Sequence, residues 1–130
     1  MTLAVPHAPI SWGELIDKIT ILEIKVEKLV DAFAKANAAH ELELLHALAT
    51  PALADARIAD LAGQLRHQNE ALWDIEDRIR DKERAKQFDM DFIALARSIY
   101  QSNDRRGALK REINLALGSS LIEEKSYRPY

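Results

Sequence analysis

Residues 11–33 read SWGELIDKITILEIKVEKLVDAF, and this stretch decides the fold class. Ser11 is an N-cap and Glu14 follows three residues later, which is the spacing of a capping box. Ile10 before the cap and Leu15 at the fourth helical position form a hydrophobic staple. From there apolar residues recur at alternating spacings of four and three: Leu15, Ile19, Leu22, Val26, Leu29 and Phe33. The spacing predicts an amphipathic helix with a heptad seam.

The apolar face of this first helix is wider than a two-stranded seam requires. Further apolar residues lie beside the seam, at Ile16, Ile21, Ile24 and Val30. A helix with so broad an apolar face needs neighbours on more than one side. The stretch therefore predicts a helical bundle.

Two helices are expected in the middle of the chain. Asn37 is placed to cap a short helix over 38–49 that contains several leucines. Thr50 followed by Pro51 is typical of an N-cap and a first helical position. We therefore expect a long helix over 51–86.

A last long helix begins after Asp89, its expected N-cap, and ends near Leu117 with Gly118 as a stop. The predicted fold is an all-α antiparallel bundle of three long helices and one short helix, with coiled-coil-like packing. The expected organisation has three parts: an N-terminal extension (1–10), the bundle (11–118) and a C-terminal tail (119–130).

Composition excludes several classes of protein. The chain has 130 residues, of which 48% are apolar, and a formal net charge of −3, so disorder is not expected. The absence of cysteine excludes disulfide scaffolds, thiolate zinc sites and cysteine nucleophiles. No signal-peptide pattern and no membrane-spanning run is present, so we expect a cytoplasmic protein without membrane partners.

The last two helices expose an anomaly when they are paired. If they form a hairpin that turns near residues 87–88, facing positions sum to about 175 and the two apolar seams match without a slip. This register sets Gln68 opposite Arg106. It also places four polar residues in the middle of the apolar seam: Gln68, Asn103, Arg106 and Lys110.

Three interpretations of this polar layer stay open. Arg106 and Lys110 can bury their stems while their charges stay in water. The layer can fix register or oligomeric state at a cost in stability. It can also bind an anion, with Lys18 or Lys25 of the first helix completing the site. Carboxylates close to the cations in sequence weaken that last interpretation: Glu76, Asp77 and Asp104.

Other motifs give no positive sign of chemistry. Glu43 and His46 form a single Glu-x-x-His pair, whereas di-iron bundles need two such pairs, so we expect no metal. No nucleophile elbow or glycine-rich phosphate loop is present, and we expect no cofactor. The basic run over 105–111 is interleaved with acidic residues, which favours a solvated helix face over nucleic-acid binding.

Four segments together resemble a bacterial family of short all-helical proteins that is catalogued as a domain of unknown function. They are residues 11–28 (SWGELIDKITILEIKVEK), 72–83 (LWDIEDRIRDKE), 98–114 (SIYQSNDRRGALKREIN) and 122–127 (IEEKSY). Related domains accompany tetratricopeptide or glycosyltransferase modules, so the resemblance implies a role beside cell-surface polysaccharide assembly. It implies no catalytic residue.

The function expected from the sequence is a non-enzymatic interaction or assembly module. The broad apolar face of the first helix and the length of the third, about 54 Å, exceed what a compact monomer covers, so a homodimer is expected, with another protein as a further partner.

The alternative is a small helical enzyme or a binder of an anionic metabolite at the polar layer. Enzymes of the chorismate-mutase type surround a dicarboxylate with Arg and Lys in a helical bundle, but this analogy is one of fold alone. The two readings differ in whether Arg106 and Lys110 converge on an open cavity or are paired with carboxylates.

Overall fold

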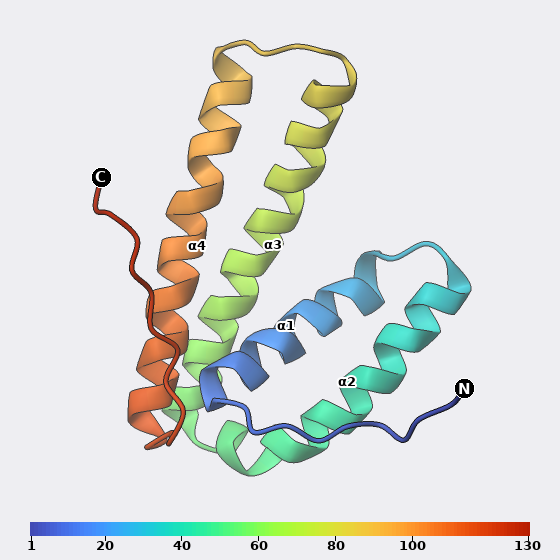
Figure 1. Cartoon of the computed structure of the whole chain (residues 1–130), viewed down its shortest axis with the longest axis vertical. Helices are drawn as coiled ribbons and strands as arrows, with labels where there is room; N and C mark the ends of the chain where they lie inside the picture. Colours follow the sequence, from blue (N-terminus) through green and yellow to red (C-terminus); the bar gives the residue numbers. More distant parts are fainter.

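The computed structural model describes the whole chain, residues 1–130, as four α-helices without a β-strand. The helices are α1 (Trp12–Lys28), α2 (Ala32–Leu53), α3 (Ala56–Arg84) and α4 (Met90–Ala116). The first two form one antiparallel hairpin, and α3 and α4 form a second, longer one (Figure 1). The prediction of an all-α fold is confirmed.

The first helix begins where the capping box predicts. The Ser11 hydroxyl accepts a hydrogen bond of 3.2 Å from the backbone N–H of Glu14. The helix ends five residues before Phe33, although the heptad spacing continues. The reason is Asp31, whose carboxylate accepts a 2.8 Å hydrogen bond from the backbone N–H of Ala34 and so starts a new helix.

The second helix extends beyond the predicted range 38–49 at both ends and has 22 residues. Pro51 does not begin a new helix, because it lies in the last turn of α2. Asp55 begins α3: its carboxylate accepts hydrogen bonds of 2.9 and 3.2 Å from the backbone N–H groups of Arg57 and Ile58. The helix begins at Asp55 rather than at Thr50 and Pro51, because the aspartate satisfies two free N–H groups of the first turn.

Both predicted limits of the last helix are confirmed. The Asp89 carboxylate accepts a 3.0 Å hydrogen bond from the backbone N–H of Phe92. After α4, Gly118 has a φ of 61°, in the left-handed region that favours glycine. This conformation lets the backbone N–H of Ser119 reach the carbonyl of Asn114 at 2.8 Å, which closes the helix.

The core lies where the two hairpins meet. One cluster joins α1, the end of α2 and both helices of the second hairpin: Ile16, Ala52, Ile58, Leu61, Leu65 and Ile113. A smaller cluster joins α1 to α2: Leu15, Ile19 and Ala49. None of the four helices combines the length and the apolar character that crossing a membrane requires.

The second hairpin reaches well past the first (Figure 1). An ion pair of 3.5 Å between Lys28 and Asp74 joins the end of α1 to α3. Beyond it, α1 and α2 no longer lie beside α3 and α4 (Figure 1), and the tail end reaches this part where Tyr130 packs on Tyr100. We call residues 75–101 the tip, and the rest of the four helices the base.

The last residues, 119–130, form an extended segment that runs back along α4, and we call it the tail (Figure 1). All of its residues after Ser119 are exposed. The tail therefore lies on the surface of the base rather than within the core.

Candidate functional site

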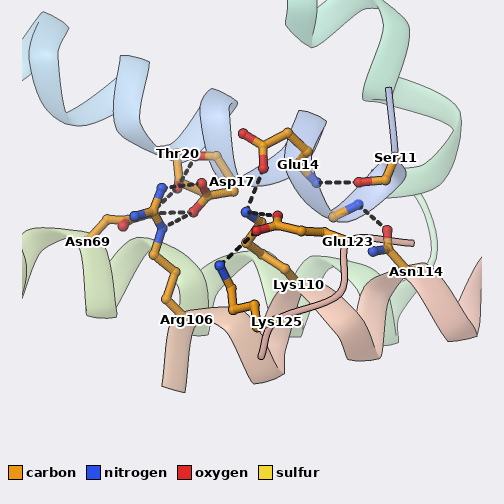
Figure 2. A network of polar contacts seen from close by, with 11 residues as sticks. Ser11, Glu14, Asp17, Thr20, Asn69, Arg106, Lys110, Asn114, Glu123 and Lys125 are labelled. Atoms are coloured by element: carbon orange, nitrogen blue, oxygen red, sulfur yellow. Dashed lines mark hydrogen bonds and ion pairs between the residues drawn. The ribbon is translucent and has the colours of Figure 1, made fainter. Parts of the chain in front are cut away.

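A buried carboxylate lies at the centre of the base. Asp17 of α1 is 0% exposed. The guanidinium of Arg106 binds it through two hydrogen bonds, from Nε at 2.8 Å and from Nη2 at 2.5 Å (Figure 2). Such a two-point contact is the strongest form of ion pair between these side chains. It ties α1 to α4.

The third helix also binds this carboxylate. Asn69 of α3 donates a 2.9 Å hydrogen bond to Oδ1 of Asp17 and another of 2.9 Å to the hydroxyl of Thr20 (Figure 2). Thr20 in turn donates to the backbone carbonyl of Asp17 at 2.8 Å. No buried side-chain nitrogen or oxygen lacks a partner. In the folded chain the polar layer is this network around Asp17 and Arg106 together with Lys110, and all its buried polar atoms find hydrogen-bond partners within the chain.

The second cation of the layer lies between two carboxylates. The ammonium of Lys110 is 2.5 Å from Glu14 of α1 and 2.9 Å from Glu123 of the tail (Figure 2). Burial of the ammonium lowers its pKa, but the hydrogen bonds to Glu14 and Glu123 outweigh burial, and the pKa is raised overall. Lys110 therefore keeps its positive charge.

The tail carboxylate has a perturbed pKa. Glu123 accepts hydrogen bonds from Lys125 at 2.7 Å and from Lys110 at 2.9 Å. These contacts lower its pKa to about 2. The pKa of Arg106 is raised, first by its hydrogen bonds to Asp17, although burial acts in the opposite direction. Glu123 and Arg106 are therefore charged at neutral pH.

The start of α1 touches the backbone of α4. The backbone N–H of Gly13 donates a 2.6 Å hydrogen bond to the Asn114 side chain, which is 1% exposed. A Cβ added at Gly13 would lie 2.4 Å from the carbonyl oxygen of Lys110. Only glycine fits here, because any side chain would push the two helices apart.

A cleft opens beside this layer, under the tail. Its volume is about 380 Å³, and its walls include Glu14, Arg106, Lys110, Glu123 and Lys125. Each cation in this wall already contacts a carboxylate. No three His, Asp or Glu side chains come together in a way that can hold a metal ion. The arrangement is built to join segments of the chain.

The structure brings only two of the predicted site residues into the layer, Arg106 and Lys110. Lys18 lies apart on the surface, where it pairs with Glu41 at 3.0 Å. Lys25 is partly buried and forms no ion pair. The two lysines of the first helix therefore lie outside the layer, and an anion site there stays a prediction.

The polar residues of the predicted seam are also displaced by one position. Asn103 is exposed, and Ser102, at 2% exposure, is buried in its place. Gln68 accepts a hydrogen bond of 3.3 Å from Arg105 rather than facing Arg106. The physical reason is α1, which packs against one flank of the hairpin and draws Arg106 away from α3.

The sequence did not indicate which carboxylates neutralise the cations. The expected candidates do not do so: Glu76 and Asp77 are exposed on the tip, and Asp104 accepts a hydrogen bond from Tyr130. The actual partners come from α1 and the tail, at Asp17, Glu14 and Glu123. One signal was present, since Asp17 stands among the apolar residues of the broad face of α1.

Comparisons with known proteins identify the family without a function. No curated protein and no solved structure matches the chain. A family model described as a family of unknown function (DUF6165) matches residues 7–129, which is nearly the whole chain and includes the layer and the tail. The resemblance seen in the sequence is confirmed at this level. The chain belongs to the DUF6165 family.

Proposed function

We propose that the protein is a non-enzymatic assembly module that forms a homodimer through the tip. The observation that carries the proposal is an apolar seam that continues into the tip without a helix to cover it. The seam residues of the base are fully buried, as for Leu65 and Ile113 at 0% exposure. In the tip Leu95 is buried, at 6% exposure, but the other seam residues are only partly buried: Ile75, Ile79, Phe92 and Ile99.

Further apolar side chains at the tip face solvent. Ile93 is 46% exposed, Phe88 is 56% exposed and Met90 is 75% exposed. Two helices cannot bury an apolar seam from all sides, and four helices around one seam can. A second copy of the tip supplies the two missing helices, in the symmetric arrangement that most homodimers adopt.

Two charged residues of α3, one just before the tip and one within it, fit a second copy. In an antiparallel pair of α3 helices centred on Ile79, Asp74 of one copy lies opposite Arg84 of the other. Both side chains are exposed, at 65% and 81%. Opposite charges at the rim contribute more to orientation and association rate than to affinity. These two charges therefore support an antiparallel orientation of the two copies, and they are not evidence that the dimer forms.

The alternative, an anion-binding or catalytic site in the layer, has less support. Arg106 and Lys110 face three carboxylates, those of Glu14, Asp17 and Glu123. A bound anion would have to displace one of them, since no positive charge is left over.

The proposal keeps the cytoplasmic location expected from the sequence.

Sedimentation equilibrium of the full chain at micromolar concentration tests the proposal. We expect twice the mass of one chain, and a single-chain mass for the Ile75→Glu, Ile79→Glu variant, because carboxylates in the seam cannot be buried against a partner. Circular dichroism checks that the variant keeps its helices.

A matched control lies on α2. Leu44 and Leu48 are 53% and 60% exposed, and the Leu44→Glu, Leu48→Glu variant should remain dimeric. A wild-type chain that sediments as a monomer across this range would contradict the proposal, as would a dimer that the tip variant leaves intact.

A further inference from the structure

The tail covers a groove on α4 that lies mainly on the base and reaches the edge of the tip at Tyr100. Two adjoining clefts of about 400 and 380 Å³ lie under the tail. Both are lined by Gly107 and Lys110 of α4 and by Glu123, Lys125 and Tyr127 of the tail. The tail runs back along α4 (Figure 1), and both clefts are lined by residues of the tail and of α4.

Two successive carboxylates of the tail meet two successive cations of the groove. Glu123 lies 2.9 Å from the ammonium of Lys110, and Glu124 lies 3.0 Å from the guanidinium of Arg111. Two neighbouring carboxylates of the tail thus match two neighbouring cations of α4. This match selects segments with two neighbouring acidic residues.

An aromatic contact lies at the other end of the groove. The ring of Tyr130 packs edge-to-face on Tyr100, with 5.0 Å between the centroids. The hydroxyl of Tyr130 donates a 2.6 Å hydrogen bond to Asp104. A tyrosine fits this position, because Tyr100 offers a ring for its ring and Asp104 offers a carboxylate for its hydroxyl.

Between these two ends the tail comes close to the helix. A Cβ added at Gly107 would lie 3.2 Å from Cε of Lys125, whose flexible side chain can shift by a few tenths of an ångström to admit a small residue. Glycine in the middle of a helix is unfavourable for helix stability. At Gly107 the side chain of Lys125 in the tail comes close to the backbone of α4.

Side chains alone hold the tail in the groove. No backbone–backbone hydrogen bond involves residues 120–130, all of which are exposed. The polar contacts that hold the tail are therefore those of its side chains with α4 and α1. The same twelve residues of another copy offer the same contacts.

We infer that this groove is a binding site for an extended peptide with two consecutive carboxylates followed by a tyrosine, and that a second copy of the chain supplies its tail as this peptide. The chain's own tail fills the groove within one copy, and exchange of tails joins two copies reciprocally. The attached tail has the higher effective concentration, so exchange is favoured where copies are concentrated. It does not require the tip interface.

Crosslinking between two single-cysteine chains tests this inference, because the protein has no cysteine of its own. One chain carries Gly107→Cys and the other carries Lys125→Cys, and the concentrated mixture is treated with a short bifunctional maleimide. We expect a covalent dimer of unlike chains. Its yield should be on the order of tenfold above that from random collision, because a docked tail raises the local concentration of the second thiol.

The control mixture replaces Gly107→Cys with Gly63→Cys, at an exposed glycine of α3 with nothing near its Cβ position. A yield no higher than that of this control would overturn the inference. A chain with both Gly107→Cys and Lys125→Cys should crosslink to itself when dilute, and its failure to do so would overturn the groove contact.

The failure of this inference can be told from the failure of the tip interface. The crosslinking mixture is repeated with Ile75→Glu and Ile79→Glu in both chains. The same yield is expected, because neither Ile75 nor Ile79 lines the two clefts. A yield that falls to the level of the Gly63→Cys control would overturn the claim that the groove binds on its own.

Discussion

The base and the tip share one hairpin and one heptad pattern, yet they differ in burial. In the base, Leu65 and Ile113 are 0% exposed because α1 and α2 pack over them. In the tip, Ile79 and Ile99 continue the same pattern and stay partly exposed. The difference teaches that periodicity sets which residues point inward, whereas the number of neighbouring helices sets how far they are buried.

The two regions also differ in their polar residues. The base encloses a carboxylate, Asp17, with every hydrogen-bonding group satisfied. The charges of the tip are exposed, as for the Arg84–Asp81 pair, whose side chains are 81% and 69% exposed. Buried polar contacts therefore join the helices of the base, whereas most charged side chains of the tip lie on the surface.

The largest expected effect comes from equal truncations in the two regions. Leu65→Ala should lower the free energy of unfolding by about 3–4 kcal/mol, because it leaves a cavity in a packed core. Ile79→Ala should cost about 1 kcal/mol in the monomer, because solvent already reaches the site. Urea unfolding at low protein concentration measures both. Equal losses at the two positions would break the distinction between base and tip.

Removal of the buried carboxylate should have the next largest effect. Asp17→Ala leaves the guanidinium of Arg106 without its partner and should cost about 3 kcal/mol. Lys18→Ala, at the neighbouring exposed pair, should cost less than about 1 kcal/mol. Thermal or urea unfolding compares them, and similar losses would mean that the layer does not stabilise the base.

Two glycines offer a test with opposite signs. Gly13→Ala should destabilise by about 2 kcal/mol, because its Cβ would overlap the backbone of Lys110. Gly63→Ala should stabilise by about 0.5–1 kcal/mol, because its site in α3 is open and alanine favours a helix. Chemical unfolding of both variants under one set of conditions decides the signs, and a stabilising Gly13→Ala would refute the close contact of α1 with α4.

The smallest expected effect concerns the tail. The pKa of Glu123 is lowered to about 2 in the folded chain from an ordinary value of 4.5. Its stabilising contribution is therefore complete above pH 4.5 and is lost as the pH falls toward 2. Because this carboxylate is 42% exposed, we expect less than about 1 kcal/mol.

Comparison with Glu123→Gln isolates this contribution. The difference in unfolding free energy between wild type and variant should shrink as the pH falls through this window, while the other carboxylates affect both proteins alike. A difference that does not change between pH 5 and pH 2 would contradict the assigned contact.

Much of the fold follows from local signals in the sequence. Ser11 and Asp89 start their helices as predicted, because each satisfies free N–H groups through contacts within a few residues. The errors arose where two signals competed. Asp31 starts a new helix although the heptad spacing continues, and Asp55 starts α3 in place of Thr50 and Pro51. Which of two possible caps is used is seen only in the folded chain.

The polar layer was predictable only in part. The sequence places Arg106 and Lys110 as cations on an apolar seam, because that inference needs only the pairing of the last two helices. Their partners Glu14, Asp17 and Glu123 lie far away in sequence, on α1 and on the tail. How α1 packs on the hairpin decides these contacts, and no pattern within a single helix carries that information.

Hydrogen exchange at two protein concentrations tests the central claim most directly, namely that the tip is an uncovered part of a bundle which a second copy completes. The account predicts that amides of residues 75–101 become more protected as concentration rises through the micromolar range, while those of the base do not change. Protection in the tip that is independent of concentration, or that rises equally in the base, would contradict it.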